Sequence, residues 1–237
     1  MFVMGIDPGL SRCGYGVVRR AARHGPASLQ AVAAGVITTL PTDGVPCRLA
    51  ALGAELRALL LEYSPSVVVV ERVLFQANAR TAMAVGQASG IAMAAAADAG
   101  AEVVQYSPNE VKMAVTGYGS ATKGQVQMMV KQVLGLDVIP RPPDVADALA
   151  LAICHLGRAS LARAAALAEA AGAGARTAGA SPAGASARTA GASPAGAGAR
   201  TAGASPAGAS AAQTAGASPA GAPAAGAGAV AALGVRS

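Results

Sequence analysis

The order of strand-like and helix-like segments limits what this chain can fold into more than any other feature. Three strand-like segments come first with short turns between them, at residues 2–6, 14–18 and 29–37. Helical patterns then alternate with single strand-like segments, at residues 46–63, 67–70, 78–99 and 102–106. Short connections favour an antiparallel meander, whereas helical connections favour parallel neighbours. The pattern therefore predicts an α/β fold with one five-stranded mixed sheet flanked by helices.

This element order is that of a ribonuclease H-like fold, in which the first and fourth strands are parallel neighbours. Asp7 follows the first apolar segment, and Glu71 follows the β-branched run of residues 67–70. In such a sheet the two carboxylates lie side by side, although 63 residues separate them in the sequence. Further helices are expected at residues 122–134 and 144–168, and Ser107 to Glu110 has the pattern of a helix-capping box.

A change of composition near residue 170 divides the chain. We expect residues 1–170 to form one domain with the ribonuclease H-like fold, because a chain of about this length can bury a substantial core. Residues 171–237 consist almost entirely of Ala, Gly, Ser, Thr and Pro, with a twelve-residue repeat. No repeat unit has a large apolar face that could stack on its neighbour. We therefore predict that this tail is disordered.

Charge and cysteine content exclude several classes of protein. Residues 1–170 hold fourteen Lys and Arg against twelve Asp and Glu, whereas the tail adds four Arg and no acid. The high isoelectric point thus comes largely from the tail and is weak support for nucleic-acid binding. Three widely spaced cysteines indicate neither a zinc site nor a disulfide framework. With no signal-like segment at the start, we expect a soluble cytoplasmic protein without a membrane partner.

Four carboxylates stand next to apolar sequence, where a charge is costly unless it is paired or binds a metal: Asp7, Glu71, Asp144 and Asp147. The last two are three residues apart and share one face at the start of a helix. Each acid also has a structural interpretation. Asp7 can form a turn, Glu71 can mark a strand leaving the core, and an aspartate pair suits a helix N-terminus. Together they predict an oxygen-only site for Mg²⁺ or Mn²⁺, with nuclease chemistry if two ions bind.

Motifs throughout residues 1–165 resemble the RuvC family of Holliday junction resolvases. The resemblance rests on Asp-Pro-Gly at 7–9 with Gly-Tyr-Gly at 14–16, and on the segments at 71–73, 86–90, 107–112, 119–127 and 143–150. It implies a Mg²⁺-dependent crossover junction endodeoxyribonuclease with two ions per site, which Mn²⁺ can replace. The implied enzyme acts in recombination and repair and cuts two opposed strands symmetrically. Asp7, Glu71, Asp144 and Asp147 match the family's catalytic, metal-binding acids.

The resemblance also implies partners and DNA-binding residues. The partners are four-way junction DNA, a second copy of the chain, and a branch-migration motor of the RuvA and RuvB type. The residues expected near DNA are Lys112, Lys123, Arg72, Leu74, Phe75 and Asn78. The family commonly has an aromatic wedge where this chain has Leu74, and Phe75 follows it. Phe75 either takes over the wedge or belongs to the core, and both lysines could be ordinary exposed helix residues.

Two other function classes remain open at this point. One is a junction-binding scaffold with weakened catalysis, which the change at Leu74 and the unusual tail keep open. The other is a sugar kinase or actin-like ATPase, whose related sheets also begin with an Asp-x-Gly turn. Those proteins need a second duplicated domain, and residues 1–170 are too few for both domains. A cleavage assay separates the scaffold from the nuclease, and nucleotide binding would reveal the ATPase.

Overall fold

The computed structural model describes residues 2–21, 28–72 and 79–177. Within these ranges, one five-stranded sheet has the order β3-β2-β1-β4-β5. Its strands are β1 (Phe2–Asp7), β2 (Arg12–Arg20), β3 (Leu29–Thr38), β4 (Val67–Glu71) and β5 (Glu102–Tyr106). β1 is antiparallel to β2 and parallel to β4, so the predicted mixed sheet with adjacent first and fourth strands is confirmed.

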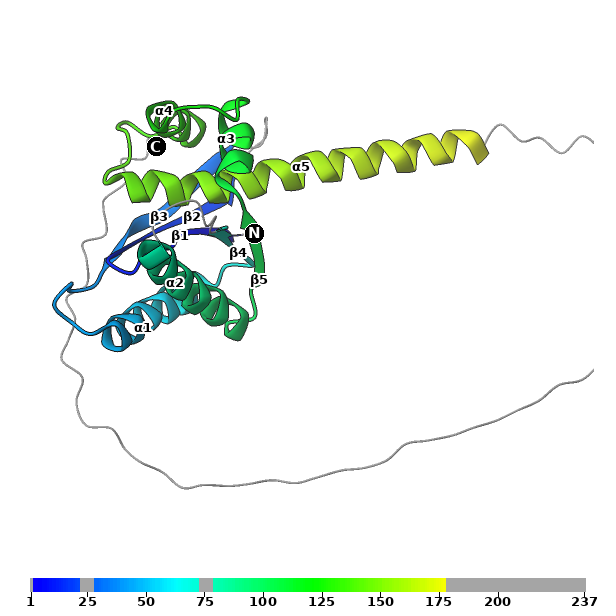
Figure 1. Cartoon of the computed structure of the whole chain (residues 1–237). Coiled ribbons are helices and arrows are strands. Elements are labelled where there is room, and N and C mark those ends of the chain that lie inside the picture. The colour runs from blue at the N-terminus through cyan, green and yellow to red at the C-terminus, as the bar shows by residue number, and fades with distance from the viewer. Residues whose placement is uncertain (1, 22–27, 73–78, 178–237) are drawn as a thin grey trace, which may run out of the picture. The chain divides into compact units, whose positions relative to one another are not determined.

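Helices cover both faces of this sheet (Figure 1). On one face lie α3, α4 and the long α5, and on the other lie α1 and α2. Their bounds are α1 (Val45–Tyr63), α2 (Ala79–Asp98), α3 (Pro108–Thr116), α4 (Lys123–Leu134) and α5 (Pro143–Thr177). The described residues up to Glu169 belong to one compact unit. The α/β layers place the carboxyl ends of β1 and β4 at the same edge of the sheet.

The core follows from the two-residue alternation of side chains along each strand. In β4, Val67 and Val69 pack into the cluster beneath α3, α4 and α5, whereas Val68 and Val70 pack into the cluster beneath α1 and α2. All four are essentially inaccessible to solvent. A continuous β-branched run is what a strand buried on both faces requires. The prediction of a central strand at residues 67–70 is therefore confirmed.

Two glycines let α5 lie close to the sheet. A Cβ atom added to Gly5 of β1 would clash with the backbone carbonyl of Ala148, and one added to Gly14 of β2 would clash with that of Asp144. Both contacts involve helix backbone, which cannot move away as the end of a flexible side chain can. The absence of side chains at these positions therefore brings the first turns of α5 directly against β1 and β2.

The predicted helix boundaries differ most at α5, which we expected to end at residue 168 and which continues to Thr177. Four of the nine added residues are Ala, which has the highest helix propensity and offsets the cost of the two interspersed Gly. Within the described ranges, the segment Pro143–Glu169 is long and apolar enough to cross a membrane by length and composition. Just over half of the most apolar 18-residue stretch of this segment is buried inside the protein, which is typical of a core helix.

Candidate metal centre

Asp7 and Glu71 end neighbouring parallel strands. Ile6 of β1 lies opposite Val70 of β4, so the next residue of each strand is one of these two acids. The carboxyl ends of parallel strands meet at one edge of a sheet, which is a frequent position for functional groups in α/β proteins. The adjacency expected from strand order is therefore present.

Asp144 and Asp147 reach the same edge from the beginning of α5. Gly14 is paired with Asp7 across the β1–β2 ladder, and Gly14 also lies directly beneath the backbone of Asp144. Asp147 lies one helical turn further along α5. Three segments that are far apart in the sequence thus contribute acids to one end of the sheet.

The electrostatics show that the carboxylates affect one another. The pKa of Asp7 is raised to about 7, mainly by burial and then by the charges of Glu71, Asp147 and Asp144 in that order, against a lowering by Lys123. Burial, followed by the charge of Asp147, also raises the pKa of Glu71. Burial is likewise the largest cause of the raised pKa of Asp147. A cluster of this kind gains stability from any cation that enters it.

Two of the acids have basic partners. Arg12, the first residue of β2, donates from Nε and Nη2 to Oδ2 of Asp144 at 3.2 and 2.8 Å. Lys123, the first residue of α4, lies 3.7 Å from Oδ2 of Asp147. Sequence reasoning did not identify Arg12. Its position after the Asp7 turn was a usable signal, because an antiparallel second strand starts beside the end of the first.

The donor set suits a hard divalent cation, since carboxylate oxygens are the ligands that Mg²⁺ and Mn²⁺ prefer. The raised pKa of Asp7 places the other three acids within electrostatic reach of it. In the described part of the chain, however, no three His, Cys, Asp or Glu side chains are arranged so that they could hold a metal ion. Binding of a cation by this set therefore requires side-chain rearrangement, with Arg12 and Lys123 as the competing partners.

The residues expected near DNA fall into two groups. Lys112 of α3 and Lys123 both lower the pKa of Glu71 through their charge, which places them near the acids. Arg72 follows Glu71, and its Nη2 donates to the backbone oxygen of Gln105 at 3.3 Å. Leu74, Phe75 and Asn78 lie outside the described residues, so the proposed wedge stays a prediction.

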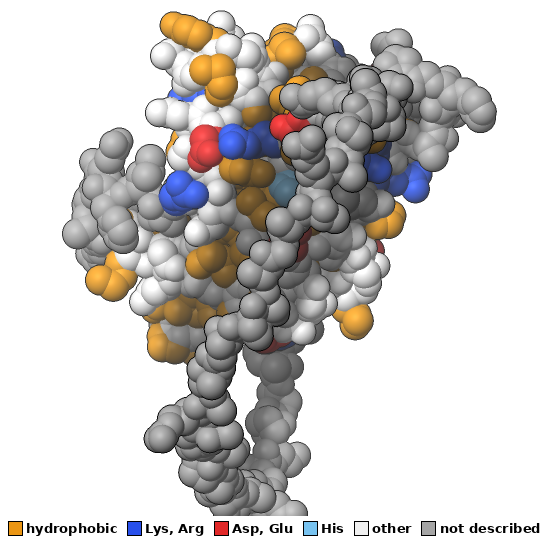
Figure 2. All heavy atoms as spheres, turned by 90° about the vertical axis from the view of Figure 1, so that its right-hand side faces the viewer, with side chains coloured by type: hydrophobic (Ala, Val, Ile, Leu, Met, Phe, Trp, Pro, Cys, Tyr) orange, Lys and Arg blue, Asp and Glu red, His pale blue; other side chains and the backbone are white. Residues whose placement is uncertain are grey.

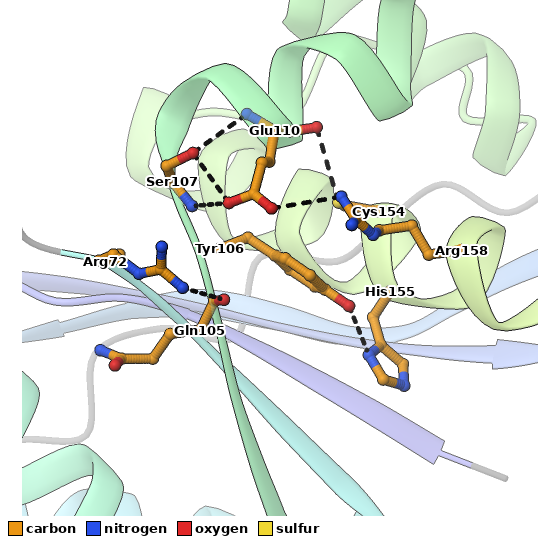
Figure 3. Close-up of polar contacts among 8 residues, drawn as sticks. All are labelled: Arg72, Gln105, Tyr106, Ser107, Glu110, Cys154, His155 and Arg158. Carbon is orange, nitrogen blue, oxygen red and sulfur yellow. Dashed lines mark hydrogen bonds and ion pairs between the residues drawn. The ribbon is translucent and has the colours of Figure 1, made fainter.

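A polar network joins β5, α3 and α5 beside this edge (Figure 3). Glu110 accepts hydrogen bonds from the backbone nitrogen and Oγ of Ser107, each at 2.9 Å, which confirms the predicted capping box. Arg158 of α5 lies 3.4 Å from Glu110, and its guanidinium stands 5.1 Å from the ring centre of Tyr106. The Tyr106 hydroxyl bonds Nδ1 of His155 at 3.1 Å. These contacts hold α5 against β5, and His155 takes part in them through its hydrogen bond with Tyr106.

One face of the molecule is seen in Figure 2, which is turned so that the right-hand side of Figure 1 faces the viewer. Its described Lys and Arg side chains lie among acidic and hydrophobic ones. This face is therefore chemically mixed.

The raised pKa of Asp7 predicts a pH-dependent stability in the absence of metal. Folding raises this pKa from 3.8 to about 7, so the folded state binds more protons between these values. The stabilisation is complete below pH 3.8 and is lost as the pH rises through 7, up to about 4 kcal/mol.

An Asp7→Asn variant has no carboxyl group at this position, so its stability does not fall in this way as the pH rises. In EDTA its Tm should exceed that of the unmodified protein at pH 8, and the difference should shrink toward pH 5. Parallel Tm curves would contradict the electrostatic account.

Comparisons with known proteins agree with this arrangement. Residues 3–155 match the family model described as crossover junction endodeoxyribonuclease RuvC. The chain is 46% identical over 155 residues to the crossover junction endodeoxyribonuclease RuvC of Natranaerobius thermophilus, covering 65% of this chain and 94% of that protein. It is 52% identical over 158 residues to the RuvC of Salinispora arenicola, covering 67% and 89%.

Solved structures give the same result. Thermus thermophilus RuvC has a TM-score of 0.64 and 36% identity, covering 68% of this chain and 97% of that one. The structure of T. thermophilus RuvC in complex with a Holliday junction substrate has a TM-score of 0.63 and 36% identity, covering 68% and 96%. The match extends over the sheet, its helices and the segments that carry all four acids. This chain therefore belongs to the RuvC family of crossover junction endodeoxyribonucleases.

Proposed function

We propose that this chain resolves Holliday junctions by divalent-metal-dependent hydrolysis of two opposed DNA strands, and that Asp7, Glu71, Asp144 and Asp147 are its catalytic acids. The observation that carries the proposal is that β1, β4 and the start of α5 bring all four acids to one edge of the sheet, where the other three charges help to raise the pKa of Asp7. Such a cluster is unfavourable without a cation, so its presence at the end of β1 calls for one. Family membership supports the same substrate.

The residues divide the chemical work between them. The four carboxylates would hold Mg²⁺, in a pair of ions in our proposal, and Mn²⁺ would substitute. The bound cation supplies Lewis acidity to the phosphate and lowers the pKa of water. Glu71 and Asp7, on the rigid strand ends, fix the position of the centre, whereas Asp144 and Asp147 close it from α5. Lys112 and Lys123 lie near the acids and can neutralise the phosphate of the strand being cut.

Loss of Lys123 is expected to reduce junction cleavage more than junction binding. Lys123→Ala removes the partner of Asp147 and one positive charge beside the phosphate, so cleavage at saturating Mg²⁺ should fall by about 10- to 100-fold. The matched control is Lys131→Ala, the same change in the last turn of α4. Single-turnover rates measure cleavage, and binding in Ca²⁺ measures affinity. Equal rates for the two variants would remove Lys123 from the proposed machinery.

We further propose that the active enzyme is a homodimer that works with a branch-migration motor of the RuvA and RuvB type. A two-fold dimer presents one site to each of two opposed strands of a four-way junction, which makes paired cuts possible. Each cut is expected to leave a 5′-phosphate and a 3′-hydroxyl. Sedimentation of the free protein tests the dimer, and a monomer that makes single, unpaired nicks would reject it.

The proposed division of the chain is a nuclease domain of residues 1–170 and a cationic tail of residues 171–237. The predicted disorder of this tail is corrected for residues 171–177, which continue α5, and stays a proposal for residues 178–237. The enzyme would act in the cytoplasm on its DNA substrate. The tail has four Arg and no acid, so it should contribute non-specific, salt-sensitive attraction to DNA. Deleting it should weaken duplex binding at low salt and leave junction cleavage intact, and unchanged duplex binding would reject this role.

A synthetic four-way junction with each strand labelled in turn tests the proposed function. With Mg²⁺ we expect cuts at symmetric positions in two opposed strands, and with EDTA we expect none. A linear duplex of the same sequence is the control for structure selectivity. Tight junction binding without cleavage in Mg²⁺ or Mn²⁺ would instead identify the chain as a junction-binding scaffold.

A further inference from the structure

The carboxylate of Asp144 forms an ion pair with a basic side chain of the same protein, that of Arg12. Both Nε and Nη2 of Arg12 donate to the same oxygen, Oδ2, at 3.2 and 2.8 Å. Two charge-assisted bonds orient this carboxylate toward the start of β2. Of the acids at this edge, Asp144 therefore has a neutralising partner, and Asp147 has a longer contact of 3.7 Å with Lys123.

The fold makes the pair between Arg12 and Asp144 a direct consequence of strand register. Gly14 stands opposite Asp7, and Arg12 enters β2 two residues earlier, opposite Thr38 of β3. Gly14 allows the backbone of Asp144 to lie directly against β2. Arg12 is the first residue of β2, next to the contact between Gly14 and the backbone of Asp144, so its side chain can reach the Asp144 carboxylate. Its guanidinium lies at the rim of the site while its partner belongs to the acid cluster.

A divalent cation and Arg12 compete for Asp144. A metal ion held by the cluster needs a carboxylate oxygen of Asp144, but Oδ2 of Asp144 already accepts both hydrogen bonds from Arg12. The double positive charge of the metal ion also repels the guanidinium. Arg12 is also free to leave, because half of its side chain is exposed, compared with 26% of that of Asp144. An ion pair with this much solvent access is weak and can be exchanged without disturbing the core.

We propose that Arg12 is an internal counter-ion that holds Asp144 while the metal is absent and releases it when a divalent cation binds, and that it thereby sets the metal concentration at which the centre fills. Arg12 acts through Asp144 and is a positioning residue. The inference rests on the proposed metal site. It also accounts for the lack of a ready-made three-ligand group among the described residues, since the Asp144 carboxylate is directed to Arg12.

Mn²⁺ binding to the full-length protein, followed by the paramagnetic resonance of free Mn²⁺, tests this role. Arg12→Gln removes the competing charge, so the Kd for Mn²⁺ should fall by about two- to fivefold, the range expected for breaking an exposed ion pair. Arg12→Lys keeps the charge without the paired donors and should lie between the two. The control is Arg19→Gln, which removes the same charge from the opposite end of β2, where Arg19 bonds Gln30. Its Kd should be that of the unmodified protein.

A second measurement distinguishes the replacement of Arg12 by a metal ion at Asp144 from a general disturbance of the site. The Mg²⁺ concentration at half-maximal junction cleavage should fall in Arg12→Gln by the same factor as the Kd. An affinity equal to that of Arg19→Gln would overturn the inference and leave the proposed function intact. A weaker affinity in both Arg12 variants would overturn it too, since Arg12 would then support the ligand geometry. Absence of Mn²⁺ binding by the unmodified protein would overturn the metal site and the inference together.

Discussion

Replacing Asp7 with Asn is expected to abolish cleavage of four-way junctions while leaving their binding nearly unchanged. Asp7 ends β1 at the point where β4 and α5 bring the other acids, and its pKa responds to all three. The amide keeps the shape of the side chain and removes the charge that a divalent cation requires. Losing a charged ligand should lower the single-turnover rate by about 10³-fold or more, on the scale of other electrostatic contributions to catalysis.

Binding should persist in this variant because affinity for DNA comes mainly from phosphate contacts of basic residues. Asp98→Asn, the same change at the exposed end of α2, serves as the control and should cleave normally. The comparison is made by gel shift in Ca²⁺ and by cleavage in Mg²⁺ with the same junction. An Asp7→Asn protein that cuts at the unmodified rate would remove Asp7 from the centre.

Gly14→Ala is expected to have the second large effect, because it forces two segments of the site apart. The new Cβ would clash with the backbone carbonyl of Asp144, so either β2 or the first turn of α5 must move. Overpacking of this kind costs about 1 to 3 kcal/mol of folding free energy. Displacing a catalytic carboxylate by about 1 Å can cost about 100-fold in rate. We therefore expect a lower Tm and a cleavage rate reduced by at least that factor.

Gly157→Ala is the control, because it makes the same Gly-to-Ala change at a position where the new Cβ does not push two segments apart. Gly157 lies on α5, and a Cβ there meets open space. Alanine in a helix interior is favoured over Gly by about 1 kcal/mol, so this variant should be slightly more stable and fully active. Thermal unfolding and cleavage are measured for both variants at saturating Mg²⁺. A Gly14→Ala protein that is as stable and active as Gly157→Ala would show that the close approach of α5 to β2 is unnecessary.

The layered fold could be predicted because its signals are local. The β-branched run of β4, the capping box at Ser107 and the short turns around β2 each specify one element, and their order implies the sheet topology. The adjacency of Asp7 and Glu71 followed from that order alone. The same reasoning placed Asp144 and Asp147 on one helix face, since residues three apart are neighbours there.

What could not be predicted depends on register and on close packing between distant segments. The pair between Arg12 and Asp144 requires both the β1–β2 register and the approach of α5 over Gly14. The contact of Tyr106 with His155 and Arg158 likewise requires the position of α5 along the sheet. The end of α5 was placed too early because Ala-rich sequence continues a helix without any apolar pattern to mark it.

The most direct test of the metal centre is an anomalous difference map from crystals of the protein soaked in Mn²⁺. Our account predicts density between the carboxylates of Asp7, Glu71, Asp144 and Asp147, with the Arg12 guanidinium withdrawn from Asp144. Crystals of Asp7→Asn under the same conditions should show weaker density or none. Mn²⁺ bound elsewhere and none at these acids, in a protein that cleaves junctions in solution with Mn²⁺, would contradict the account.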